Sequence, residues 1–143
     1  MNDLSLGART AIALHRTVYR WSGGRLGHHL GSLEQVLVTT TGRRTGAPRT
    51  TPLMLVETDD TLVLVASVGG GPRHPAWYLN LRDEPAVRVQ RGRTRFPARA
   101  RTATGEERAR LWAAAVAANP TYATYQTRTE REIPVVVLER VRT

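Results

Sequence analysis

Cysteine and lysine are both absent from the 143 residues of this chain. Without cysteine, disulfide bonds and thiolate metal sites are excluded. All 21 basic side chains are arginine, a bias that a GC-rich coding sequence would also produce. The net charge of +9 indicates attraction to anions, which include phosphate-bearing ligands, acidic lipids and nucleic acid. Charge alone does not choose among them.

A long uninterrupted apolar run is also missing. In MNDLSLGARTAIALHRTVYRW, Arg9 and Arg16 interrupt the apolar residues, so neither a signal peptide nor a spanning helix fits. We therefore expect a cytoplasmic protein, or one peripheral on the inner face of the cell membrane. Apolar residues between Leu4 and Tyr19 recur at helical spacing, which predicts a leading amphipathic helix within residues 1–24. This helix either covers the core of its own domain or contacts a membrane surface.

The chain has the size and the 41% hydrophobic content of one ordinary domain, and no linker or repeat divides it. From Gln35 the apolar period becomes two, and QVLVTTT, TTPLMLVE and TLVLVASV predict a three-stranded meander. AVRVQRG and TRFPARART predict two strands that turn at Gly92, and IPVVVLERV predicts a sixth. Pro97 favours an edge position or a bulge.

Two helices are predicted between these strands. HPAWYLNLRDEP begins with a proline near its first turn, and TGEERARLWAAAVAANP has Thr104 and Glu107 at the spacing of a capping box. The whole pattern predicts a single α+β domain over residues 1–143, with a small barrel of about six mostly antiparallel strands, a leading helix and two inserted helices.

The stretch TTGRRTGAPR resembles an anion site in outline. Its glycines allow the backbone to expose N–H groups, Thr41 and Thr45 add hydroxyl groups, and Arg43, Arg44 and Arg49 offer the planar forks that match phosphate or carboxylate. The alternative is a solvated hairpin turn in an arginine-rich protein, since no phosphate-loop lysine or following helix is present.

Three glycines in ASVGGGPRHPAWYLNL allow a ligand to approach the backbone, beside the positive end of a helix. Trp77 and Asn80 would share one side of that helix, although Trp77 taken by itself favours plain core packing. His74 is interpreted as a neutral structural histidine, because no nucleophile and orienting acid accompany it. His28 and His29 lack the spacing to a third donor, so no metal is predicted.

Tyr122 and Tyr125 in NPTYATYQTRTER would share one face of a helix. Their hydroxyls could donate to a carbonyl or nitro oxygen, or the two rings could simply cover the barrel.

Taken in order, LVTTTGRRTGAPRTTPLMLV, LVLVASVGGGPRHPAWYLNL, EERARLWAAAVAANPTYATYQ and TEREIPVVVLE resemble the deazaflavin-dependent nitroreductase family, the coenzyme F420-dependent quinone and nitro reductases. The resemblance runs from about Leu26 to Glu139. It implies a split β-barrel related to the flavin-mononucleotide-binding oxidoreductases, with F420 held in a groove and its phosphate-glutamyl tail toward solvent.

The resemblance also implies a set of site residues, which we carry over motif by motif. The tail would bind to Arg43, Arg44, Thr45 and Arg49. The deazaflavin would lie along Thr50, Thr51, Pro52, Leu53 and Met54, opposite Val65, Ala66, Ser67 and Val68, with Ala76, Trp77, Tyr78, Leu79, Asn80 and Tyr122 closing the pocket. The acceptor would lie near Met54, Ser67, Asn119, Tyr122 and Tyr125. Of these, Ser67, Tyr122 and Tyr125 are the catalytic candidates, because a hydroxyl can stabilise charge on the acceptor's oxygen.

Some family members carry tyrosine where this chain has Met54 and Asn119, and lysine where it has Val68. These departures bear on activity toward bulky nitroimidazoles and leave reduction of quinones, other nitroaromatics or enones open. The expected function is an F420H2-dependent reductase of a quinone-like small molecule, acting as a monomer or a homodimer.

Two alternatives stay open at this point. The first is a non-catalytic F420, flavin or haem carrier. The second is a basic nucleic-acid-binding domain, suggested by six arginines on one predicted hairpin (Arg88, Arg91, Arg93, Arg95, Arg99 and Arg101). Alternation along strands would spread these arginines over both faces, and no nucleic-acid-reading motif is present, so no specific nucleic-acid partner is expected.

Overall fold

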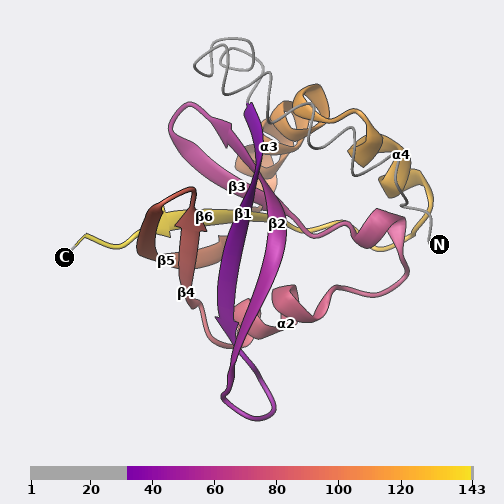
Figure 1. Cartoon of the computed structure of the whole chain (residues 1–143). Coiled ribbons are helices and arrows are strands. Elements are labelled where there is room, and N and C mark those ends of the chain that lie inside the picture. The colour runs from indigo at the N-terminus through magenta and orange to yellow at the C-terminus, as the bar shows by residue number, and fades with distance from the viewer. Residues whose placement is uncertain (1–31, 143) are drawn as a thin grey trace, which may run out of the picture.

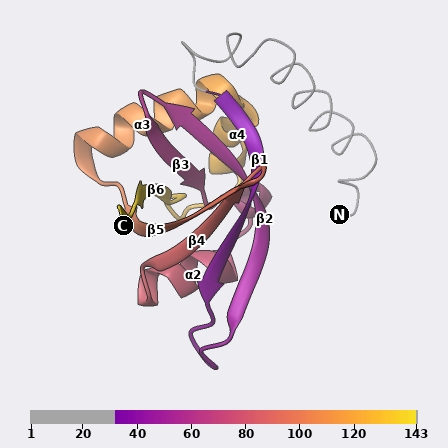
Figure 2. The ribbon, with the colours of Figure 1, turned by 60° about the vertical axis from the view of Figure 1, so that its left-hand side comes forward.

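The computed structural model describes residues 32–142, and the predicted leading helix lies outside them. Within this range, six strands form a closed antiparallel barrel in the order β1-β2-β3-β6-β5-β4 (Figures 1 and 2). The strands are β1 Ser32–Thr41, β2 Pro48–Thr58, β3 Thr61–Val65, β4 Ala86–Arg91, β5 Thr94–Thr102 and β6 Val135–Arg140. The helices are α2 Ala76–Asp83, α3 Gly105–Ala118 and α4 Thr121–Thr127, with a 3-10 turn, η2, at Val68–Gly70.

All six predicted strands are present, and their turns follow local backbone chemistry. Asp59 and Asp60 both have positive φ, 49° and 64°, and they join β2 to β3. Gly92 has a φ of 60° and turns β4 into β5. Two-residue turns with positive φ match the right-handed twist of the strands they connect, so both hairpins are fixed locally.

The barrel interior forms the first core. Alternate residues of every strand point inward, among them the fully buried Val38, Leu55 and Leu64. Helix α2 adds Trp77, Tyr78 and Leu81 to the same cluster. The tyrosine hydroxyl lies 2.9 Å from Thr102 Oγ1, which satisfies its polar end. Helix α2 is thereby fixed at the barrel's end.

A second core lies outside the barrel. The outward residues of β2, β3 and β6 pack against α3 and α4, which cover this side together in Figure 1. Val63 and Leu111 are fully buried there. The helices therefore occupy two places, with α2 at the end of the barrel and α3 with α4 on one outer face. The site described below lies where these two places meet.

The predicted capping box at the start of α3 is wrong. Thr104 occupies the N-cap position but makes no side-chain capping hydrogen bond. Glu107 instead accepts two hydrogen bonds from Arg101, from Nη1 at 2.6 Å and from Nη2 at 2.9 Å. A bidentate guanidinium is a stronger partner for a carboxylate than a backbone N–H, so Glu107 binds Arg101 and does not cap the helix.

The predicted edge position of Pro97 is also wrong, because β5 pairs with β4 on one side and β6 on the other. Pairing with β6 begins only at Ala98, opposite Arg140, and the Pro97 carbonyl accepts the Val141 N–H at 2.9 Å. The proline nitrogen therefore lies past the end of the ladder, where no donor is required.

Candidate functional site

Two adjoining pockets share Trp77. The larger has a volume of about 850 Å³ and lies between β2, the end of β3, η2, and the α3–α4 junction. We call it the apolar pocket; it is lined by Leu33, Pro52, Leu53, Met54, Leu64, Val65, Ser67, Val68, Gly69, Pro75, Trp77, Ala118, Asn119, Thr121, Tyr122 and Tyr125. The other, of about 630 Å³, is the arginine pocket, lined by Gly42, Arg43, Arg44, Thr45, Pro48, Arg49, Thr50, Thr51, Ala76, Trp77 and Asn80.

The turn that carries the arginines has a fixed backbone. The Gly42 N–H donates to the Ala47 carbonyl at 2.7 Å, and the Gly46 N–H donates to the Gly42 carbonyl at 2.7 Å. Gly46 has a φ of 77°, a left-handed conformation that glycine adopts without strain. The Thr45 hydroxyl accepts the Ala47 N–H at 3.2 Å, so it is used within the turn.

Asn80 joins this turn to α2. Its Oδ1 accepts the Arg43 backbone N–H at 3.2 Å and Arg43 Nη1 at 3.1 Å, and its Nδ2 donates to Thr40 Oγ1 at 3.2 Å. Asn80 and Thr40 are both buried. The asparagine therefore satisfies three polar groups at once and sets the position of the turn relative to Trp77 on the same helix.

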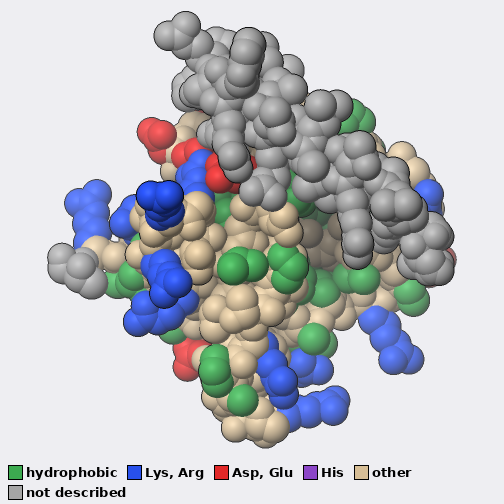
Figure 3. Space-filling view, viewed as in Figure 1, with side chains coloured by type: hydrophobic (Ala, Val, Ile, Leu, Met, Phe, Trp, Pro, Cys, Tyr) green, Lys and Arg blue, Asp and Glu red, His purple; other side chains and the backbone are tan. Residues whose placement is uncertain are grey.

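The arginine pocket has the chemistry of an anion site. Arg44 and Arg49 are exposed, and within residues 32–142 neither makes an ion pair or a side-chain hydrogen bond. Figure 3 shows arginine side chains gathered beside the lower tip of the β1–β2 hairpin. Guanidinium groups without a protein carboxylate can bind a phosphate or carboxylate in bidentate fashion, so these residues fit an anionic tail.

The apolar pocket has a strained wall. Val68, which lines it, has a φ of 45° and is 55% exposed. A β-branched residue in the left-handed region costs of order 1–2 kcal/mol. Beside it, Ser67 is 8% exposed, and its hydroxyl has no hydrogen-bond partner among the described residues. An apolar side chain at the rim and a hydroxyl inside suit a ligand that is mostly apolar with a polar atom.

The opposite wall carries the two tyrosines of α4. Tyr122 and Tyr125 contact each other at a ring-centroid distance of 6.4 Å and an angle of 63°. Burial raises the pKa of Tyr122 to about 12, and the neighbouring Asn119 side chain partly offsets this. The Tyr122 hydroxyl is therefore protonated at neutral pH and available as a hydrogen-bond donor. The prediction that the two tyrosines share a helical face is confirmed.

His74 lies outside both pockets. Its Nδ1 is 3.0 Å from Arg131 Nη1, and its ring contacts that of Tyr78 at a centroid distance of 4.9 Å and a tilt of 56°. Burial lowers the pKa of His74, and the guanidinium groups of Arg131 and Arg82 lower it further. These contacts agree with a neutral structural histidine.

Most of the predicted site residues line one of the two pockets, and all five predicted acceptor residues line the apolar pocket. Three predicted cofactor residues line neither pocket: Ala66 is fully buried, Tyr78 points into the barrel core, and Leu79 packs against that core. Trp77 has both of the roles considered for it: it packs in the first core, and it lines both pockets.

Sequence reasoning missed several residues. Leu33, Leu64, Ala118 and Thr121 line the apolar pocket, and Pro48 lines the arginine pocket. Gly42 and Gly69, which belong to the two glycine stretches expected to approach a ligand, line the arginine pocket and the apolar pocket. Thr40 and Arg131 support the walls from behind. The pocket-lining residues come from strand starts, helix ends and turns, where residue type carries no signal of a ligand.

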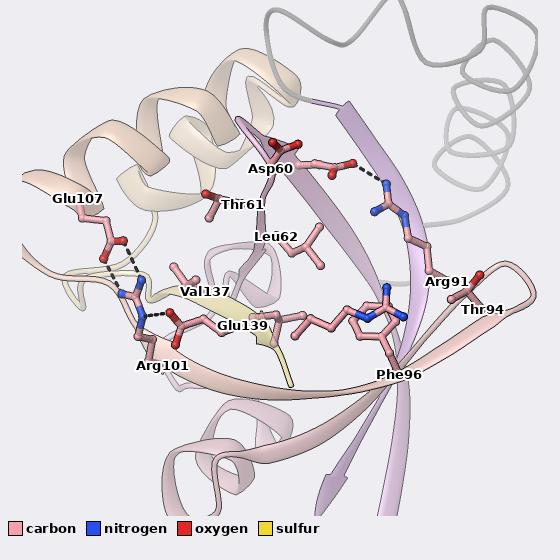
Figure 4. Close-up of a pocket in the computed structure, with 13 residues that line it drawn as sticks. Asp60, Thr61, Leu62, Arg91, Thr94, Phe96, Arg101, Glu107, Val137 and Glu139 are labelled. Carbon is pink, nitrogen blue, oxygen red and sulfur yellow. Dashed lines mark hydrogen bonds and ion pairs between the residues drawn. The ribbon is translucent and has the colours of Figure 1, made fainter. Parts of the chain in front are cut away.

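A further pocket, of about 600 Å³, lies around the Arg91 end of the barrel (Figure 4). Two of its three arginines are paired with carboxylates of the chain, and the third, Arg140, lies over the Phe96 ring at 4.5 Å. Arg91 Nη2 donates to Glu34 at 2.6 Å and to Glu57 at 2.7 Å, while Arg101 binds Glu107 and lies 3.3 Å from Glu139. Since these charges are already compensated, this pocket has less to offer an anion than the arginine pocket.

The predicted spread of the hairpin arginines over both faces is wrong for four of them. Arg88, Arg95, Arg99 and Arg101 all lie on the outer face of β4 and β5, because Arg88 pairs with Pro97, Arg99 with Ala86, and Phe96, Ala98 and Ala100 alternate with them into the core. Arg91 points inward to its glutamates. These outer arginines lie outside both pockets and serve as charge-matched controls for the arginine pocket.

Among residues 32–142, no group of three or more histidine, aspartate or glutamate side chains could hold a metal ion. No helix in the same range is long and apolar enough to cross a membrane. A closed six-stranded barrel in which an apolar pocket adjoins an arginine-lined pocket defines a protein of the split-barrel class.

Comparison with known proteins identifies the family within that class. Residues 11–140 match the family F420H(2)-dependent quinone reductase. An F420H(2)-dependent quinone reductase of Mycobacterium tuberculosis (strain ATCC 25618 / H37Rv) is 42% identical over 133 residues, which are 90% of this chain and 89% of that protein. The chain therefore belongs to the F420H(2)-dependent quinone reductase family, and the predicted family is confirmed.

Solved structures agree with this. An F420-H2-dependent reductase, FDR-A, is 49% identical with a TM-score of 0.68, covering 73% of this chain and 93% of that chain. A chain described as a domain-swapped dimer has the same identity and TM-score and covers 73% of this chain and 79% of its own. The predicted split-barrel fold is confirmed.

Proposed function

We propose that this protein is an F420H2-dependent reductase of quinone-like acceptors. The observation that carries the proposal is that two pockets of opposite character adjoin at Trp77. One is apolar with hydroxyl groups, and the other has arginines that make no ion pair within residues 32–142. A deazaflavin with an anionic tail needs this combination. The family name and the name of the mycobacterial relative support the choice of cofactor and acceptor class.

The residues of the arginine pocket fit the cofactor's tail. Arg44 and Arg49 have no protein anion within the described residues, and Arg43 is held by Asn80 at the same rim. In the proposed complex they bind the phosphate and the first carboxylates. Reduced F420, when bound, supplies a hydride, while the protein supplies orientation and a dry site.

The walls of the apolar pocket position the cofactor's ring and the acceptor. Pro52, Leu53, Met54 and Val65 form apolar surfaces on β2 and β3, and Trp77 closes the side toward the tail. Removing water from this volume strengthens every hydrogen bond made to the acceptor inside it.

Reduction places negative charge on the acceptor's oxygen, and three hydroxyl groups could stabilise it. Tyr122, with its raised pKa, remains a donor at neutral pH, and Tyr125 and Ser67 line the same pocket. We propose these three as the groups that donate to the oxygen, with the final proton coming from solvent. Met54 and Asn119 also line this pocket and contribute no hydroxyl group, which favours quinones over bulky nitroimidazoles.

The test is the oxidation of F420H2 by menadione under anaerobic conditions, followed by the return of F420 absorbance. We expect saturable turnover that depends on both components. A protein that binds F420 but gives no turnover with menadione, other quinones, nitroaromatics or enones would instead be the carrier, and a protein that does not bind F420 would contradict both functions.

The solved relative described as a domain-swapped dimer supports a homodimer for this chain. Light scattering coupled to gel filtration separates a dimer from a monomer. Peripheral membrane contact through residues 1–24 remains a proposal, which sedimentation with vesicles of anionic lipid would test.

A further inference from the structure

Arg131 lies behind the wall of the apolar pocket and binds almost only backbone. Its Nε donates to the Gly71 carbonyl at 2.9 Å, and its Nη2 donates to the carbonyls of Ser67 at 2.9 Å and Ala66 at 3.2 Å. Its Nη1 lies 3.0 Å from His74 Nδ1. One guanidinium therefore holds three carbonyls of the segment from residue 66 to residue 71.

Among the described residues, no carboxylate pairs with this guanidinium. Arg131 is partly buried and makes no ion pair within residues 32–142, and desolvation lowers its pKa. A charged group that is removed from water without a counter-ion needs good hydrogen bonds to offset the cost. The hydrogen bonds of Arg131 therefore hold one segment of backbone in place.

That segment carries the hydroxyl group inside the apolar pocket. The Ala66 and Ser67 carbonyls flank the Ser67 Cα on either side, so Arg131 fixes both peptide planes of this residue. Ser67 is 8% exposed and lines the pocket, and its hydroxyl has no hydrogen-bond partner among the described residues. Since this hydroxyl is not among the buried unpartnered atoms, it is open to the pocket, where a ligand can accept its hydrogen bond.

Arg131 also connects this wall with the tyrosine wall. Gln126 of α4 donates from Nε2 to the Arg131 carbonyl at 2.8 Å, and its Oε1 accepts the Ile133 N–H at 3.0 Å. Gly70 lies so close to α4 that an added Cβ would be 2.6 Å from the Tyr125 carbonyl oxygen. The Ser67 segment and α4 are therefore fixed to each other through residue 131.

We propose that Arg131 is a positioning residue for the acceptor. It acts through Ser67, by holding the two flanking carbonyls so that the serine hydroxyl faces into the pocket and donates to the acceptor's oxygen. This inference rests on the proposed function, because it assigns the ligand of that hydroxyl as the quinone carbonyl. Arg131 itself takes no part in proton or electron transfer.

A double-mutant cycle tests the proposal with Ser67→Ala, Arg131→Gln and the combined variant. If Arg131 acts through Ser67, each single change lowers kcat for menadione about tenfold, the size expected for one hydrogen bond. The combined variant then stays within about twofold of either single variant, while F420 affinity changes little. Arg131→Lys keeps the charge with fewer donors and should recover part of the rate.

The control is Arg108→Gln. Arg108 is also partly buried and donates from Nη2 to a backbone carbonyl, that of Ile133 at 2.7 Å, but it lines no wall of the apolar pocket. Its replacement should lower Tm, and its effect on kcat should be independent of Ser67→Ala. If Arg131→Gln lowers kcat equally with and without Ser67, Arg131 is merely structural and the proposal is overturned. If Arg131→Gln does not fold, Arg131→Lys replaces it in the cycle.

A measurement of menadione binding without F420 tests the role of Arg131 independently of the proposed catalytic function. The Kd of menadione is measured with the same variants by quenching of tryptophan fluorescence in the absence of F420, since Trp77 lines the pocket. Non-additive losses of affinity support the role of Arg131 even in a protein that gives no turnover. Additive losses, or equal Kd values in all variants, contradict it.

Discussion

The side chain of Asn80 accepts two hydrogen bonds from Arg43, from its backbone N–H at 3.2 Å and from its guanidinium at 3.1 Å. These residues lie 37 positions apart, on α2 and on the β1–β2 turn. The same helix carries Trp77, which lines both pockets. The position of the arginines relative to the apolar pocket therefore depends on one amide.

Asn80→Ala tests this dependence. It leaves the Arg43 N–H and the buried Thr40 hydroxyl without their partner, at a cost of about 2–3 kcal/mol in the free energy of unfolding. We expect F420 affinity to fall about tenfold as well, because the turn is no longer held. Gln90→Ala is the control, since among the described residues that amide makes a single side-chain hydrogen bond, to the Gly92 carbonyl at 3.4 Å. Unfolding in urea and F420 titration measure the two effects, and equal F420 affinity in the two variants would contradict the role of Asn80.

Replacement of the pocket arginines should weaken F420 binding in a salt-dependent manner. For Arg43→Ala and Arg49→Ala we expect losses of about tenfold at low salt that shrink near 0.5 M salt, where the screening length is only about 4 Å. Arg88→Ala and Arg95→Ala remove the same charge from the outer face of β4 and β5 and should change the affinity by less than about twofold. Equal effects from both pairs would mean that overall charge, and not the pocket, binds the tail.

Gly70→Ala should displace α4. Gly70 has a φ of 82°, and a Cβ there would lie 2.6 Å from the Tyr125 carbonyl oxygen and 2.9 Å from Arg128 Cβ. The expected loss of stability is about 3 kcal/mol or more, with a raised KM for the acceptor. Gly92→Ala is matched, since Gly92 has a φ of 60° but no atom within 4 Å, and should cost only about 1–2 kcal/mol without changing KM. Thermal unfolding and steady-state kinetics compare them, and an unchanged KM in Gly70→Ala would exclude this role of the contact.

Acid should destabilise the protein through His74. The pKa of His74 is lowered by burial and by Arg131 and Arg82, so the folded state binds fewer protons than the unfolded state below the unfolded value of 6.5. The contribution is present above this pH and is lost as the pH falls through the lower folded value. His74→Gln keeps an acceptor for Arg131 without a titrating group. The fall in Tm between about pH 7 and pH 5 should therefore be smaller in the variant than in the wild type; equal slopes would contradict the assignment.

The fold could be predicted because its strands alternate clearly and their turns contain Gly92 or the Asp59–Asp60 pair. Helix α4 was harder, since its seven residues are too few for a periodicity, and only the spacing of Tyr122 and Tyr125 indicated it. The capping box failed because Arg101, on a neighbouring strand, binds Glu107, and pairing between elements is not visible in local sequence.

The arginine turn could be predicted from residue type, since guanidinium groups in a glycine turn suit an anion. Arg131 could not, because its partners are backbone carbonyls some 60 positions earlier, and a carbonyl has the same chemistry in every residue. The left-handed conformation of Val68 could not be predicted either, because a β-branched residue favours extended backbone. Both features form the wall where the acceptor is proposed to bind.

The most direct test of the central claim is a fluorescence titration of F420 into the protein at low salt, with flavin mononucleotide titrated in parallel. If the two pockets at Trp77 together hold a deazaflavin and its anionic tail, F420 should bind saturably with one site per chain and about tenfold or more tighter than flavin mononucleotide. No saturable change with F420, or equal binding of the two, would contradict the account.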